Sequence, residues 1–139
     1  MEATSDRALV GPAKSQVKAR VGLALTALPV LFLTFDAVIK LLKIAPVVEA
    51  FAHLGYPDAL AHGIGLLELA CLVAYVVPRS AVLGALLLTG FLGGAISCHV
   101  RIGDPLMSHV LFPVYVAALL WAGLYLREPR LKALLPFRN

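Results

Sequence analysis

The chain has 139 residues, enough for one domain. Hydrophobic residues make up 60% of it and charged residues only 14%, and its mean hydropathy is +0.90. A soluble domain of this size needs far more polar surface, so the composition argues against a soluble enzyme, a nucleic-acid-binding protein and a disordered chain. The net charge of +4 does not indicate nucleic acid, because most basic residues border apolar stretches, as membrane topology requires. The sequence predicts an integral membrane protein embedded in a lipid bilayer.

Residues 1–20 form a basic segment of small and polar residues, which we expect to be a mobile N-terminal tail. The apolar run behind it is longer than the apolar core of a signal peptide, so we interpret it as retained. Four apolar segments have the length of about 20 residues that crosses a bilayer. They cover residues 21–39, 58–77, 81–100 and 110–126. These segments predict an all-α fold, an antiparallel bundle of four transmembrane helices over residues 21–126, followed by a basic tail over residues 127–139.

The connections between the segments differ in character. Residues 46–54 begin with Pro46 and predict a short helix on the outer membrane surface between the first two spans. Asp58 is a candidate cap of the second span, and Ser108 of the fourth. The turn at Pro78-Arg79-Ser80 is so short that the second and third spans must be antiparallel neighbours.

Lysine and arginine are distributed unequally between the two ends of the predicted bundle. If the N-terminus, the turn at residues 78–80 and the C-terminal tail share one side, that side carries nine of the 12 basic residues. They are Arg7, Lys14, Lys18, Arg20, Arg79, Arg127, Arg130, Lys132 and Arg138. The other side carries Lys40, Lys43 and Arg101. The positive-inside rule therefore predicts a multi-pass cell-membrane protein with both termini in the cytoplasm.

Ionisable residues in a span cost at least about 2.5–3.5 kcal/mol each on insertion scales, so they point to a site. Glu68 lies near the midplane, and Gly65 on the same face lets a helix or a ligand approach it. Asp36 and Lys40 are one turn apart and can pair. Structural alternatives are an interhelical hydrogen bond for Glu68 and a lysine that only extends to the interface.

The polar groups gather in one leaflet. Those between the midplane and the outer surface are Asp36, Lys40, His62, Glu68, His99, Arg101 and His109. The opposite halves of the spans hold no charged residue or histidine. This asymmetry predicts an outward-opening polar pocket with Glu68 at its floor, in which Lys40, Glu68 and His99 converge and Asp36 orients Lys40.

Two further features surround this predicted pocket. Tyr75 shares the helical face of Glu68 and is added to the ligand-binding candidates. A stripe of small residues precedes His99 and predicts close approach of a neighbouring helix. It consists of Gly90, Gly94 and Cys98, flanked by Thr89, Gly93 and Ser97. The two cysteines, Cys71 and Cys98, have no CxxC spacing and indicate packing rather than a metal or redox site.

Several short motifs, taken in order, resemble the DoxX-like membrane proteins over residues 20–135. They are FLTFDAVIKL at residues 32–41, Gly55-Tyr56-Pro57, Glu68, Pro78-Arg79 and GFLGGAISCHVR at residues 90–101. Ala37 stands where the family often has glycine. The resemblance implies a four-helix membrane bundle and carries over Lys40, Glu68 and His99. It also implies an association with quinol-oxidising or thiosulfate:quinone oxidoreductase complexes, or with redox-stress systems.

Three classes of function fit these residues. The first is binding of a small lipophilic molecule such as a quinone, as an oxidoreductase component with a membrane redox partner or as a homo-oligomer. In it Glu68, His99, Lys40 and Asp36 carry the chemistry, and Arg101, His109, His62 and Tyr75 bind the ligand. The second is a cofactor-free isomerase or hydrolase that uses Glu68 and His99 as acid and base. The third is a non-catalytic scaffold or transporter, although the sequence has no inverted repeat.

Haem is a less favoured cofactor. Axial ligation needs histidines that face one another across the bundle. His99 and His109 bracket one loop at similar depth, so the sequence leaves this alternative open.

Overall fold

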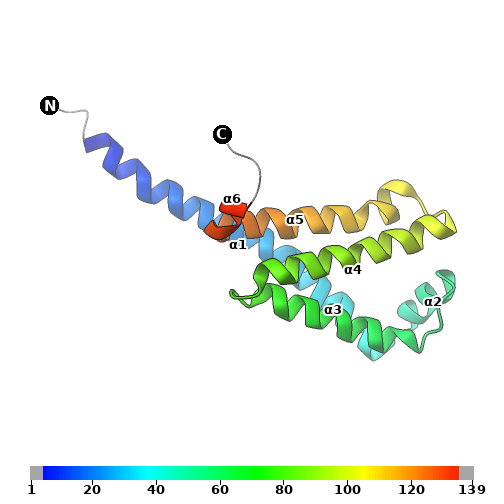
Figure 1. Ribbon diagram of the computed structural model, residues 1–139. Coiled ribbons are helices and arrows are strands. Elements are labelled where there is room, and N and C mark those ends of the chain that lie inside the picture. Colours follow the sequence, from blue (N-terminus) through cyan, green and yellow to red (C-terminus); the bar gives the residue numbers. More distant parts are fainter. Residues whose placement is uncertain (1–4, 135–139) are drawn as a thin grey trace.

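The computed structural model describes residues 5–134, apart from the side chains of residues 5–13, 132 and 134. It is a bundle of helices, and the described part of the chain contains no strand (Figure 1). The elements are α1 (Ser5–Leu42), α2 (Ala45–His53), α3 (Leu60–Val76), α4 (Ala81–Ile102), the π-helix η1 (Leu106–Val110), α5 (Phe112–Arg127) and α6 (Pro129–Leu134). The predicted all-α fold is confirmed.

Three helical segments are long and apolar enough to cross a membrane. They are Lys14–Leu42, Ala81–Ile102 and Leu106–Arg127. The fourth apolar helix, α3, has 17 residues and lies at the lower end of the usual range of about 17–25 residues. Its apolar composition and its place inside the bundle make it the fourth member of a helical membrane bundle.

The four long helices form a ring in which each contacts two neighbours. α1 packs against α3 and α5, and α4 packs against the same two helices from the opposite side. One end of the bundle holds the turn between α3 and α4 together with α6, and the other end holds α2 and η1 (Figure 1). The buried core is mostly aliphatic and includes Leu33, Leu72, Leu88, Leu120 and Leu124, with Tyr75 among them.

Glycine sets how closely the helices approach. At Gly84 an added Cβ would lie 2.1 Å from the backbone nitrogen of Tyr75, so α3 and α4 touch backbone to backbone near their shared turn. At Gly65 it would lie 3.0 Å from the carbonyl oxygen of Ala37, so the predicted close approach at Gly65 is confirmed and α1 is the helix that makes it.

The predicted close approach at the small-residue stripe is wrong. A Cβ added at Gly90, Gly93 or Gly94 would meet no atom of another residue within 4 Å. α3 and α4 diverge from their shared turn toward the end that carries α2, so the stripe lies where the two helices are already apart (Figure 1).

The ends of the elements differ in part from the expectations. α1 begins at Ser5, so residues 5–20, expected as a tail, continue the first helix and extend past the bundle (Figure 1). Residues 1–4 and 135–139 of the predicted tails lie outside the described residues, and the division into tails and domain stays a prediction. The short helix α2 is found as predicted. Asp58 pairs with Lys43 instead of capping α3, and Ser108 lies inside η1 instead of capping α5.

Candidate functional site

An ion cluster joins α1 to α3 inside the bundle. The Lys40 ammonium lies 2.5 Å from Oδ2 of Asp36, one turn earlier on α1. The same ammonium lies 2.8 Å from Oε2 of Glu68 on α3. It also lies 5.5 Å from the centre of the Phe91 ring on α4. The cluster thus holds two carboxylates for one ammonium, with Lys40 between them.

Glu68 is the most deeply placed member of this cluster. Its side chain has no exposed surface, and Oε1 has no hydrogen-bond partner among the described residues. A buried carboxylate oxygen without a donor is costly, so Oε1 is suited to hold a proton. The small Gly65 leaves the room that α1 needs to bring Lys40 to this carboxylate.

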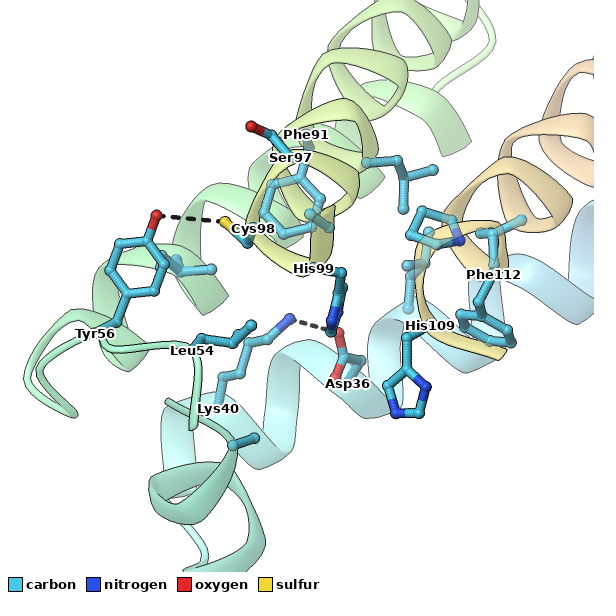
Figure 2. Close-up of a pocket in the computed structure, with 18 of the residues that line it drawn as sticks. Asp36, Lys40, Leu54, Tyr56, Phe91, Ser97, Cys98, His99, His109 and Phe112 are labelled. Carbon is cyan, nitrogen blue, oxygen red and sulfur yellow. Dashed lines mark hydrogen bonds and ion pairs between the residues drawn. The ribbon is translucent and has the colours of Figure 1, made fainter. Parts of the chain in front are cut away.

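A cavity of about 750 Å³ lies beside the cluster, toward the end of the bundle that carries α2 and η1. α1, α2, α3, α4, η1 and α5 all contribute to its walls. Most of the lining is apolar, for example Phe51, Leu54, Phe91 and Val116. The charged and imidazole groups of the lining are Asp36, Lys40, His99 and His109 (Figure 2). The size is that of pockets that enclose a small organic molecule.

The imidazole of His99 is held in place by Asp104. Nδ1 of His99 lies 2.6 Å from Oδ2 of Asp104, and Nε2 of His53 lies 3.0 Å from Oδ1. Because an ionised carboxylate only accepts hydrogen bonds, both imidazoles donate to it. The hydrogen bonds from His99 and His53 hold the pKa of Asp104 below its usual range. His109 stands edge-on to His99, with ring centres 5.6 Å apart.

The segment from α2 to Tyr56 covers the end of the cavity away from the α3–α4 turn and is fastened to α4 and to the loop that follows α4. His53 reaches Asp104, and the guanidinium of Arg101 donates to the backbone carbonyl of Leu54. The Tyr56 hydroxyl lies 3.3 Å from the sulfur of Cys98 (Figure 2). We call this segment, residues 50–56, the cover. Its fastening residues His53 and Asp104 are not among the site residues predicted from the sequence.

The structure brings together four of the eight predicted site residues, since Asp36, Lys40, His99 and His109 line one cavity. Glu68 does not line it and reaches it through Lys40. Arg101 lies beside the cavity and holds the cover.

The other two predicted residues lie elsewhere. His62 is exposed on α3 and does not line the cavity. Tyr75 is buried near the opposite end of the bundle, where its hydroxyl donates to the carbonyl of Leu120 at 2.7 Å and its ring contacts Arg127. These contacts give Tyr75 a packing role. Helical periodicity correctly places Tyr75 on the same face of α3 as Glu68, but it does not show that Tyr75 lies at a different depth from the cavity.

A bundle of apolar helices around a mostly apolar cavity with an ion cluster at its edge defines an integral membrane protein with an internal cavity. The model of the DoxX-like family matches residues 24–123, and the chain belongs to this family. The matched segment contains Asp36, Lys40, Glu68 and His99, so the resemblance inferred from the motifs is confirmed. No curated protein and no solved structure matches the chain.

Proposed function

We propose that this membrane protein binds a small lipophilic molecule, with a quinone as the candidate, in the cavity between α1, α2 and α4. The observation that carries the proposal is the asymmetry of the cavity wall. An ammonium, a carboxylate and two imidazoles stand at one part of a chamber whose remaining lining is mostly apolar. A molecule with an apolar body and hydrogen-bonding oxygens matches such a wall.

The polar groups supply what a quinone head needs. Quinone carbonyls accept hydrogen bonds, which Lys40 and His109 can donate, and quinol hydroxyls donate hydrogen bonds, which the unprotonated Nε2 of His99 can accept. With Nδ1 of His99 bound to Asp104, Nε2 is the ring nitrogen left to bind a ligand. Oxidation of a quinol to a quinone releases two electrons and two protons. In the proposed role the electrons pass to a membrane redox partner and His99 Nε2 accepts one proton. Lys40, which lies between the cavity and Glu68, passes the second proton to the Glu68 carboxylate.

Quenching of the single tryptophan, Trp121, by decylubiquinone in nanodiscs tests the binding. We expect saturable quenching in the native protein. Loss of one neutral hydrogen bond, in His99→Asn or His109→Asn, should weaken binding about threefold to tenfold. His62→Asn, an exposed histidine outside the cavity, is the matched control and should bind normally. Absence of saturable quenching, or equal weakening in the control, contradicts the proposal.

A second candidate, acid–base catalysis on an apolar substrate, is favoured by the Asp104–His99 pair. A carboxylate that holds Nδ1 of an imidazole and leaves Nε2 available is the arrangement of a general base. Glu68→Gln separates this function from binding, since it keeps size and hydrogen bonding but removes the ionisable proton. If the variant folds and keeps full binding and turnover, Glu68 has a structural role only.

A further inference from the structure

The gap between α3 and α4 gives the cavity a side opening at bilayer depth. Gly90 and Gly94 of α4 line the cavity, as does Leu67 of α3, and all three are exposed. A Cβ at either glycine would meet nothing within 4 Å, so no neighbouring helix closes this side. Nearer their shared turn, the two helices touch backbone to backbone at Gly84 and Tyr75.

Two other sides of the cavity are partly obstructed. Between α1 and α5, the rings of Phe32 and Phe112 pack edge-to-face with centres 5.2 Å apart. At the end that carries α2, the cover lies over the cavity and is fastened to Arg101 in α4 and to Asp104 in the loop after α4. The α3–α4 gap is a way into the cavity that neither of these contacts obstructs.

The gap lies deeper in the membrane than the polar groups. Gly90 is the deepest residue that α4 contributes to the lining, and it precedes His99 by nine residues, roughly 14 Å along the helix. It is the tenth of 22 residues in α4, near the middle of a span. An opening at this depth faces lipid tails, not water.

We propose that the ligand is a membrane-resident amphiphile that enters the cavity sideways from the bilayer through the gap between α3 and α4. Its polar head lies at Lys40 and His99, and its apolar tail leaves the cavity beside Gly90 and Gly94. This proposal rests on the proposed function and adds to it the direction of access and the need for a tail. A water-soluble molecule of the same head group would use neither feature.

Substitution of one glycine in the gap tests the proposal. Gly90→Leu places a side chain in the opening, and the open space at its Cβ predicts normal folding. The matched control is Gly93→Leu, whose Cβ is equally free but which does not line the cavity. The ligand pair is decylubiquinone and its tailless analogue 2,3-dimethoxy-5-methyl-1,4-benzoquinone, measured by Trp121 quenching.

We expect Gly90→Leu to weaken decylubiquinone binding about tenfold, because the tail loses its path, and to leave the tailless analogue unchanged. Gly93→Leu should bind both quinones normally. Normal binding of decylubiquinone by Gly90→Leu, or equal loss in both variants, overturns the side opening. The oligomeric state in mild detergent gives a further test. If the native protein is a dimer and Gly90→Leu is a monomer, a second copy covers the gap and the side opening is overturned.

Failure of the quinone itself is distinguishable from failure of the side opening. If the native protein binds neither quinone, the proposed ligand is wrong, and a phospholipid with a diazirine in the middle of its acyl chain tests the opening directly. Access from the bilayer is supported if the lipid labels the cavity residue Phe91 in the native protein and in Gly93→Leu but not in Gly90→Leu. Absence of labelling at Phe91 in the native protein overturns it.

Discussion

The ammonium of Lys40 lies 2.8 Å from Oε2 of Glu68, which ties the last turn of α1 to the middle of α3. Glu68 has no exposed surface, so its carboxylate depends on Lys40 for charge compensation. Asp36, the second partner of Lys40, is 31% exposed and lines the cavity. The same pair therefore supports the bundle and holds the ammonium at the cavity.

Lys40→Met should destabilise the protein by about 3–5 kcal/mol, because it leaves a buried carboxylate without its cation. The double variant Lys40→Met/Glu68→Gln removes the stranded charge and should recover at least half of the loss. SDS-induced unfolding in micelles measures both. If Lys40→Met unfolds like the native protein, Glu68 is not ionised next to Lys40 and the ion pair does not support the fold.

Asp104 makes the stability of the cover depend on pH. Its pKa is lowered by the hydrogen bonds from His99 and His53, so its contribution is fully present above the ordinary carboxyl pKa of about 4. The contribution is lost as the pH falls through the lowered folded-state value. We expect Asp104→Asn to be less stable than the native protein above about pH 5, with the difference shrinking below about pH 4.

Asp58 is the matched control for Asp104. Its pKa is also lowered, by the hydrogen bond from Lys43, but this pair joins the end of α1 to the start of α3 and does not hold the cover. Amide hydrogen exchange in the cover should speed up in Asp104→Asn and stay unchanged in Asp58→Asn. Equal exchange in the two variants would mean that Asp104 does not fasten the cover.

The bundle and part of the site were predictable because they follow from the cost of burying charge and backbone in lipid. The apolar segments, the short helix at Pro46 and the pairing of Asp36 with Lys40 all depend on local spacing. The contact of Lys40 with Glu68 follows from the need of a buried carboxylate for a donor.

The remaining features depend on how separate elements meet. Asp104 lies 51 positions from His53, and only the position of α2 over the bundle brings them together. The small residues of α4 predict a close helix contact somewhere along α4, but not its place. The short turn between α3 and α4 forces that contact to Gly84, and beyond it the helices diverge.

Gly84→Ala should therefore disrupt the α3–α4 contact. The Cβ of the alanine would lie 2.1 Å from the backbone nitrogen and 2.3 Å from Cα of Tyr75. These are backbone atoms of α3, so the clash cannot be relieved by a change of side-chain rotamer. We expect a loss of about 1–3 kcal/mol in SDS-induced unfolding, the usual cost of overpacking. Gly93→Ala on the same helix, with nothing within 4 Å, should match the native protein or be slightly more stable. A neutral Gly84→Ala would show that α3 and α4 can separate freely.

The orientation in the membrane is predicted from the nine-to-three division of basic residues and can be tested by cysteine labelling. With Cys71 and Cys98 replaced by alanine, single cysteines are placed at Met107 in η1 and at Arg79 in the turn between α3 and α4. Both positions are exposed, and they lie at opposite ends of the bundle. In intact cells, a membrane-impermeant maleimide should label Met107→Cys and not Arg79→Cys, while both should react after the cells are opened. The reverse pattern would place both termini outside, and the polar end of the cavity would then face the cytoplasm.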